Sequence, residues 1–189
     1  MRVASDAITH TYFGQLARVL EEIDPRAVDR LVESICRARD AGGTIYTLGN
    51  GGSASTASHL AVDLAKNVRR PDRPNVRVFA LTDNVGLLTA WANDAIYEEV
   101  FAAQIDGVIR PEDLLIAVSG SGNSRNVLAA VKVARAAGAY TFGITGFAGG
   151  RLAFEADDAI VVPSSNMQFV EDAHLAIAHA VMCALRDGT

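Results

Sequence analysis

The sequence predicts an α/β protein, a three-layer sandwich in which helices cover both faces of a parallel sheet. From Gly43 onward, short apolar runs alternate with helical patterns, which is the order expected of right-handed βαβ units. The apolar runs are rich in Ile, Val and Leu without polar alternation, as is typical of strands buried on both faces. The 189 residues suit one substantial core. We therefore expect a single domain over 1–189, with helices in 1–42 and the α/β core in 43–189.

Residues 5 to about 41 predict two helices that are divided near Asp24 and Pro25. Apolar residues recur at helical spacing in both halves of this segment. Asp24 is a suitable N-cap and Pro25 a suitable first-turn residue for the second helix, which Gly42 and Gly43 end. A long helical start without a strand indicates packing against a partner subunit as well as against the local core.

Five strands and six further helices are predicted in the α/β core. The strands are 44–48, 76–81, 114–118, 140–144 and 159–162. The helices are 53–67, 85–92, 97–104, 123–137, 150–156 and 168–186. The aromatic residues Phe79, Trp91, Phe101 and Phe142 are expected in the core.

Composition excludes several classes of protein. The net charge of −5 argues against a nucleic-acid partner, so the arginines at 69, 70 and 73 are interpreted as solvated loop charges. Cys36 and Cys183 form no CxxC pair, which argues against a disulfide framework. No secretory signal and no apolar run of about 20 residues is found, so we expect a cytoplasmic protein without a membrane partner.

Polar, glycine-bearing segments follow the first and third predicted strands. They are GNGGS at 49–53 and SGSGNS at 119–124. Ligands of parallel sheets bind beyond the carboxyl ends of the strands, and the backbone N–H groups at a helix start favour an anion. Two such segments together predict a phosphate site. Taken singly, each is also consistent with an ordinary cap-rich turn.

Two predicted helices each combine histidine with a carboxylate. His59 and Asp63 stand four residues apart on one helix face. The last predicted helix contains, within nine residues, Glu171, Asp172, His174 and His179. Two imidazoles and two carboxylates suit Zn²⁺ or a similar divalent ion. The alternatives are packing histidines and ordinary helix-surface pairs. The pair Asn93-Asp94 is interpreted first as a cap for the helix expected at 97–104.

These motifs, in this order, resemble the sugar isomerase (SIS) domain family, and within it the phosphoheptose isomerase branch. The resemblance is carried by GNGGS at 49–53, SHLA at 58–61, Asn93-Asp94, SGSGNSRNV at 119–127, Thr145-Gly146 and the stretch from 171 to 179. It implies a five-stranded, flavodoxin-like sheet with an N-terminal helical extension. It also implies a homotetramer with active sites at the subunit interfaces.

The resemblance further implies which residues form the site. The phosphate would lie on Ser119, Gly120, Ser121 and Ser124, and the other substrate contacts would be Asn50, Gly51, Gly52, Ser53, Asn93, Asp94 and Glu171. Zinc would be held by His59, Asp63, Glu171 and His179, with Asp63 and His179 as the catalytic acid–base pair. Asp63 and Glu171 stand where the family pattern has glutamate and glutamine. The change at 63 shortens the side chain by one methylene, and the change at 171 adds a negative charge.

We therefore expect a ketose–aldose isomerase that acts on sedoheptulose 7-phosphate through an enediol, or on a related phosphosugar. An alternative is a non-catalytic SIS adaptor that binds a replication initiator protein. A second alternative is a sugar-phosphate-sensing regulatory domain, against which the absence of an appended DNA-binding segment weighs.

Overall fold

The computed structural model describes residues 5–188 and is built around one sheet of five parallel strands. The strands are β1 (Thr44–Leu48), β2 (Arg77–Ala80), β3 (Leu114–Ser119), β4 (Tyr140–Thr145) and β5 (Asp158–Val161). They lie in the order β2-β1-β3-β4-β5. Each strand begins and ends within one residue of its predicted bounds, so the predicted α/β fold is confirmed. Both ends of the predicted domain, residues 1–4 and residue 189, lie outside the described residues.

Helices cover both faces of this sheet. One layer contains α2 (Pro25–Asp40), α3 (Gly52–Val62) and α8 (Met167–Asp187), and the other contains α5 (Ala102–Ile105), α6 (Arg125–Ala136) and α7 (Leu152–Glu155). Strand β3 contributes to both layers, because Leu114, Ile116 and Val118 pack on one side and Leu115 and Ala117 on the other. This double burial explains why the strand has no polar alternation.

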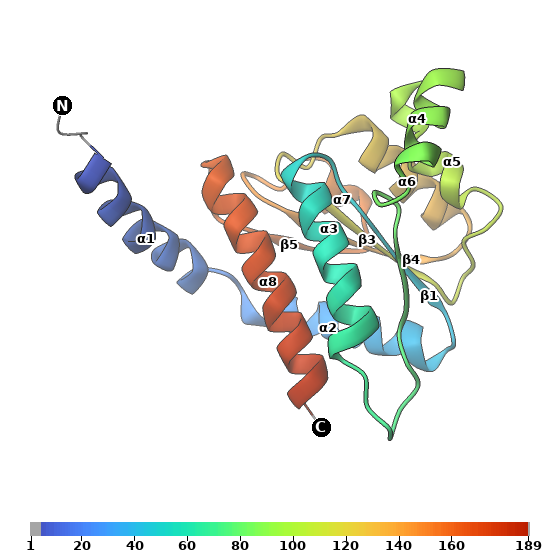
Figure 1. Ribbon diagram of the computed structural model, residues 1–189, viewed down its shortest axis with the longest axis horizontal. Helices are drawn as coiled ribbons and strands as arrows, with labels where there is room; N and C mark the ends of the chain where they lie inside the picture. Colours follow the sequence, from blue (N-terminus) through green and yellow to red (C-terminus); the bar gives the residue numbers. More distant parts are fainter. Residues whose placement is uncertain (1–4, 189) are drawn as a thin grey trace.

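The N-terminal segment forms the two predicted helices. Helix α1 (Ser5–Glu21) projects from the body of the molecule (Figure 1), whereas α2 packs on the sheet in the same layer as α3 and α8. Asp24 caps α2 by accepting a hydrogen bond from the Arg26 N–H, and Pro25 occupies the first turn. Helix α1 meets α8 through Tyr12, whose hydroxyl donates to Asp172 Oδ2 at 2.6 Å and whose ring lies 4.8 Å from that of Phe169.

Two predictions, one for the segment between β2 and β3 and one for β2 itself, are wrong. After α4 (Val85–Asp94), the expected helix 97–104 is divided into a 3₁₀ turn, η2 (Tyr97–Glu99), and α5. Val100 is the C-cap of η2 and Phe101 the N-cap of α5, and both are buried at the break between the two elements. Phe79, which was expected in the core, is 63% exposed because β2 is an edge strand.

Helix α3 does not end at a cap but continues into a π-helical turn, η1 (Asp63–Asn67). The predicted helix 53–67 is thus one continuous element whose hydrogen-bonding pattern changes at Asp63. The Asn67 Nδ2 donates to Asp63 Oδ1 at 2.8 Å, which fixes that carboxylate from within the turn. Such π turns occur frequently at functional sites.

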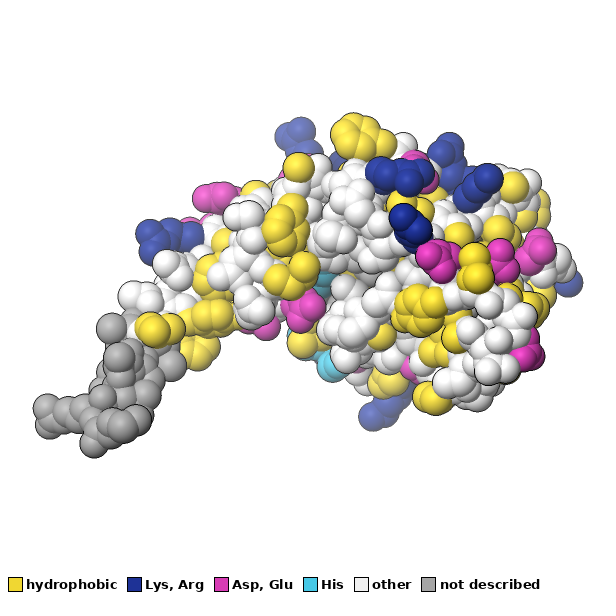
Figure 2. All heavy atoms as spheres, turned by 90° about the horizontal axis from the view of Figure 1, so that it is seen from above, with side chains coloured by type: hydrophobic (Ala, Val, Ile, Leu, Met, Phe, Trp, Pro, Cys, Tyr) yellow, Lys and Arg dark blue, Asp and Glu magenta, His cyan; other side chains and the backbone are white. Residues whose placement is uncertain are grey.

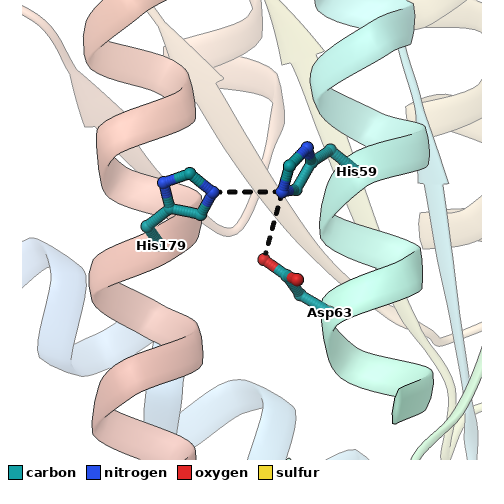
Figure 3. A group of neighbouring side chains, drawn as sticks. All are labelled: His59, Asp63 and His179. Atoms are coloured by element: carbon teal, nitrogen blue, oxygen red, sulfur yellow. Dashed lines mark hydrogen bonds and ion pairs between the residues drawn. The ribbon is translucent and has the colours of Figure 1, made fainter. Parts of the chain in front are cut away.

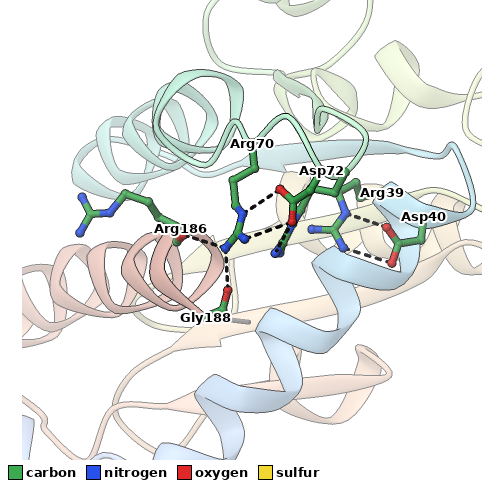
Figure 4. A network of polar contacts seen from close by, with 7 residues as sticks. Arg39, Asp40, Arg70, Asp72, Arg186 and Gly188 are labelled. Atoms are coloured by element: carbon green, nitrogen blue, oxygen red, sulfur yellow. Dashed lines mark hydrogen bonds and ion pairs between the residues drawn. The ribbon is translucent and has the colours of Figure 1, made fainter.

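Arg70, which follows η1, contacts the end of α8. Arg70 donates through Nη1 to the Gly188 carbonyl at 3.0 Å at the end of α8, and its Nε pairs with Asp72 at 3.0 Å (Figure 4). A cation at the last carbonyls of a helix is a favourable partner for them. The Arg70 hydrogen bond lowers the pKa of Asp72. Among residues 5–188, no helix is both long enough and apolar enough to cross a bilayer.

Candidate active site

The strand order creates a topological switch point at the carboxyl edge of the sheet, and the space between the two loops that begin there is called the crevice below. Strand β1 lies between β2 and β3, and the chain leaves β1 into α3 on one face and β3 into α6 on the other. Ligands of open parallel sheets bind at such a topological switch point. The GNGGS and SGSGNS segments are the two loops that begin there, so they flank one crevice as predicted.

The serine loop, defined here as Ser119–Ser124, is held by hydrogen bonds within the loop and to the end of β4. The Ser119 hydroxyl donates to Ser124 Oγ at 3.3 Å, and the Gly122 N–H donates to the Ser119 carbonyl at 3.0 Å. The Gly146 N–H donates to the Gly120 carbonyl at 2.9 Å, which joins the loop to the end of β4. Ser124 is the N-cap residue of α6 but makes no side-chain cap bond. Its hydroxyl therefore remains able to bind an anion at the start of α6.

The turn after β1 brings the backbone close to the start of α8. Gly51 adopts a φ of 56°, which favours glycine, and serves as the N-cap of α3. A Cβ on Gly52 would lie 2.6 Å from Glu171 Oε1, so the Glu171 carboxylate lies against the first turn of α3. Ser53 is buried at the same helix start. Gly51, Gly52, Ser53 and Glu171 are therefore brought together, and their contact with a substrate stays a prediction.

A histidine–carboxylate cluster lies further along α3 and α8 (Figure 3). The Nε2 atoms of His59 and His179 are 3.0 Å apart, and Asp63 Oδ2 lies 3.5 Å from His59 Nε2. Asp63 is buried, and its Oδ2 has no hydrogen-bond partner. The His59 side chain is 45% exposed, and His179 is exposed as well.

The cluster fits a divalent metal ion. Ligand atoms at about 2.0–2.1 Å from a tetrahedral zinc ion stand about 3.3–3.4 Å apart. The separations of 3.0 and 3.5 Å that involve His59 lie on either side of that value, and the ligand atoms of all three residues lie within 4.8 Å of one another. A buried carboxylate oxygen without a partner is costly unless a cation satisfies it. Two neutral imidazoles and one carboxylate form a zinc-type donor set with one position left for another ligand.

Glu171, the fourth predicted ligand, lies outside this cluster within one chain. It precedes His179 by eight residues on α8, and eight residues of helix span about 12 Å. Its carboxylate lies instead beside Gly52. The cluster is therefore made of His59, Asp63 and His179, and a role of Glu171 in metal binding stays a prediction.

Asn93 and Asp94 do not cap the following turn. Both end α4, Ile96 is the N-cap of η2, and the Asn93 side chain donates to Asp94 Oδ1 at 2.8 Å. The interpretation as a cap is wrong, because the chain needs Ala95 and Ile96 to leave α4 before η2 begins. Both side chains are exposed and lie shortly before Tyr97, whose hydroxyl reaches Asn50.

Sequence reasoning did not name Asn126 and Tyr97 as site residues, and it considered His174 only among the histidines that could bind a metal. Asn126 pairs with Asn50 across the crevice, and Tyr97 bonds to the same Asn50. His174, on the side of α8 that faces the sheet, is fully buried, and neither of its ring nitrogens has a hydrogen-bond partner. An asparagine two residues beyond a helix N-cap was the one signal that could have identified Asn126.

Burial lowers the pKa of His174, and the nearby Thr145 backbone opposes part of that shift. The unfolded chain, with an ordinary histidine pKa near about 6.5, therefore takes up a proton before the folded protein does. Stability from this group is complete above about pH 6.5 and is lost as the pH falls toward the lowered folded pKa.

We expect the free energy of unfolding to fall as the pH drops below about 6.5, with a His174 component of at most about 1.4 kcal/mol per pH unit. Denaturant unfolding of the wild type and of His174→Leu across that range isolates the component as the difference between the two curves. If the curves of the wild type and of His174→Leu ran parallel, His174 would have the same pKa in the folded and the unfolded state.

Comparison with known proteins identifies the family. The model of the SIS domain matches residues 11–146, which is more than half of the chain. The chain belongs to the SIS domain family. Among SIS proteins, it is 39% identical over 175 residues to the phosphoheptose isomerase of Roseiflexus sp. (strain RS-1), and the match covers 91% of this chain and 86% of the relative.

Solved SIS structures agree with the fold. A phosphoheptose isomerase from Neisseria gonorrhoeae superposes with a TM-score of 0.88 at 28% identity, covering 96% of this chain and 98% of that one. One from Francisella tularensis gives a TM-score of 0.89 at 25% identity, covering 98% and 100%. The resemblance to the phosphoheptose isomerase branch of the SIS family, and with it an aldose–ketose isomerase function, is thereby confirmed.

Proposed function

We propose that the protein converts sedoheptulose 7-phosphate into an aldoheptose 7-phosphate through an enediol. The observation that carries the proposal is the convergence of His59, Asp63 and His179 on helices that begin at, or run beside, a phosphate-type loop. The similarity to phosphoheptose isomerases supports the substrate class. This isomerisation requires a base, a group that moves hydroxyl protons and a phosphate-binding site. The buried carboxylate, the exposed imidazole and the serine loop can supply them.

The serine loop anchors the distal phosphate through hydroxyl and backbone N–H groups and so fixes the register of the sugar. The carbonyl end then lies toward the cluster. Asp63 takes a proton from the carbon next to the carbonyl and returns it to the former carbonyl carbon. His179 moves the hydroxyl proton between the two oxygens. Both groups sit on helices, which hold them to the geometry that proton transfer needs.

A zinc ion would be held by His59, Asp63 and His179, and it would supply Lewis-acid polarisation of the reacting oxygens. Glu171 is proposed as a sugar contact, since its carboxylate lies against Gly52 at the start of α3. Its predicted role as a further metal ligand is proposed only for an assembly in which a second chain completes the site. Asn93 and Asp94 are proposed to contact the sugar from the segment that also carries Tyr97.

Purified full-length protein tests this function directly. With C5 to C7 ketose phosphates in D₂O, we expect the fastest turnover for sedoheptulose 7-phosphate. Solvent deuterium should appear on the carbon that receives the proton, because an enediol exchanges it. Metal analysis of the same sample should find about one zinc per chain. A metal-free protein that is inert on all these sugars would favour the adaptor, and faster turnover of a shorter sugar would identify a different phosphosugar.

We propose that the chain assembles as a homotetramer with the site at a subunit interface. Exposed apolar side chains lie on α1, with Ile8 at 68% and Phe13 at 71%, and along the β2 edge, with Val62 at 57%, Phe79 at 63% and Val85 at 66%. Figure 2 shows hydrophobic side chains along the projecting helix. Patches of this kind mark protein interfaces, and a neighbour would cover the exposed histidine pair.

Light scattering coupled to size-exclusion chromatography should give four times the mass of one chain. Phe13→Asp or Phe79→Asp should lower that mass, because each places a charge in an apolar contact. Phe154 on α7 is 83% exposed and lies outside both patches, so Phe154→Asp is the matched control. A wild type of single-chain mass would contradict the proposed assembly.

A further inference from the structure

Asn50 and Asn126 form a reciprocal amide pair across the crevice. Asn50 Nδ2 donates to Asn126 Oδ1 at 2.8 Å, and Asn126 Nδ2 donates to Asn50 Oδ1 at 2.9 Å. Asn50 lies in the turn after β1, and Asn126 lies in the first turn of α6, directly after the serine loop. Asn126 is only 3% exposed. The pair therefore joins the two loops that flank the switch point.

The orientation of the pair is fixed by the backbone. The Val127 N–H can only donate, and it faces Asn126 Oδ1 at 3.0 Å. Asn126 must then present Nδ2 to Asn50, which in turn must present Oδ1. Rotating either amide by 180° would set like groups against each other. The pair thus has a single satisfied arrangement, which is locked to the start of α6.

A third segment completes the network. The Tyr97 hydroxyl donates to Asn50 Oδ1 at 3.0 Å, and Tyr97 begins the η2 turn that follows Asn93 and Asp94. Asn50 Oδ1 thus accepts from both Tyr97 and Asn126, which uses both of its lone pairs. One N–H of Asn50 remains for a ligand. The side chain predicted to contact the sugar is therefore committed mainly to holding three segments together.

We propose that Asn126 is a positioning residue that sets the GNGGS turn against the serine loop, an inference that rests on the proposed isomerase function. The serine loop fixes the phosphate end of the substrate, and the turn after β1 leads into α3, which carries His59 and continues into η1, where Asp63 lies. Asn126 acts through Asn50 and fixes the distance between the serine loop and the turn after β1. A misplacement of about 1 Å at a reacting centre can cost on the order of 10²-fold in rate.

Asn126→Ala tests this role when kcat and inhibition by inorganic phosphate are measured together. We expect kcat on sedoheptulose 7-phosphate to fall by roughly 10- to 100-fold. The inhibition constant for phosphate should stay within about twofold, because the serine loop keeps its own bonds to Gly146 and Ser124. Tyr97→Phe, which removes one of the two bonds to Asn50 Oδ1, should give a smaller loss in kcat.

Asp24→Ala controls for a general loss of stability, since it removes the cap of α2 far from the crevice and should leave kcat unchanged. An unchanged kcat in Asn126→Ala, or a phosphate constant that weakens in parallel with kcat, would overturn the positioning role. Amide hydrogen exchange gives an independent readout. Peptides covering 49–53 should exchange faster in Asn126→Ala than in the wild type, and equal exchange rates would refute the proposal even if the wild type proved inert on every sugar.

Discussion

Replacing His179 by alanine is expected to lower kcat on sedoheptulose 7-phosphate by a factor of about 10²–10⁴, which is the usual contribution of a positioned acid or base. The loss should come without unfolding, because His179 is exposed and its ring contacts His59 at a centroid distance of 4.9 Å. The zinc content should fall as well, since one of three donor atoms is removed. Kinetics, metal analysis and thermal unfolding on one preparation measure all three effects.

Asp63→Asn separates charge from packing at the same cluster. The amide keeps an oxygen for the Asn67 Nδ2 and nearly the same volume, so the η1 turn should stay intact. The change removes the negative charge next to His59 and, with it, the catalytic base. We therefore expect kcat to fall as far as in His179→Ala. Asp63→Glu restores a carboxylate on a longer arm and should retain more activity than the amide.

His10 provides the matched control for these variants, because it is an exposed histidine on α1, remote from the cluster. His10→Ala should leave both kcat and zinc content unchanged. Wild-type kinetics in His179→Ala and Asp63→Asn would refute the assignment of this cluster as the catalytic centre. Equal loss in His10→Ala would show that the effect is not specific to it.

The strands and the position of the site could be predicted because their causes are local. Buried parallel strands require continuous apolar runs, and the carboxyl edge of a parallel sheet collects whatever follows each run. The serine loop and the GNGGS turn needed only this rule to be placed together. The pairing of His59 with Asp63 followed from helical spacing alone.

The remaining features depend on contacts between distant residues, which sequence spacing does not report. Strand order decided that Phe79 lies on an edge, and no local pattern gives strand order. The α3–α8 packing brings His179, but not Glu171, to His59, because residues eight apart on one helix are separated along its axis. The change of helix type at Asp63 and the Asn50–Asn126 pair have no signature that distinguishes them from an ordinary helix and an ordinary turn.

The serine loop offers a second large effect. Gly122→Ala is expected to destabilise the protein by about 1–2 kcal/mol for a left-handed backbone and by a further ~1–3 kcal/mol for overpacking. Gly122 has a φ of 65°, and a Cβ there would overlap the Gly149 carbonyl oxygen and lie 2.8 Å from its carbon. Backbone atoms cannot move aside as the end of a flexible side chain can.

Binding should fall along with stability. The Gly122 carbonyl accepts from the Leu152 N–H at 2.9 Å, so displacing Gly149 also disturbs the contact that holds the loop to α7. We expect KM for the phosphosugar and the inhibition constant of inorganic phosphate to rise together by at least about tenfold, which corresponds to about 1.4 kcal/mol. This parallel loss is the opposite of the split expected for Asn126→Ala.

Gly107 separates the two causes, because it has nearly the same φ, 68°, but nothing within 4 Å of an added Cβ. Gly107→Ala should therefore cost only the left-handed backbone term, about 1–2 kcal/mol, and leave phosphate binding unchanged. Denaturant unfolding and phosphate inhibition of the two alanine variants give the comparison. If Gly122→Ala were no less stable than Gly107→Ala and bound phosphate equally well, the close approach of Gly149 would not constrain the loop. The serine loop would then owe its shape to its own turn residues alone.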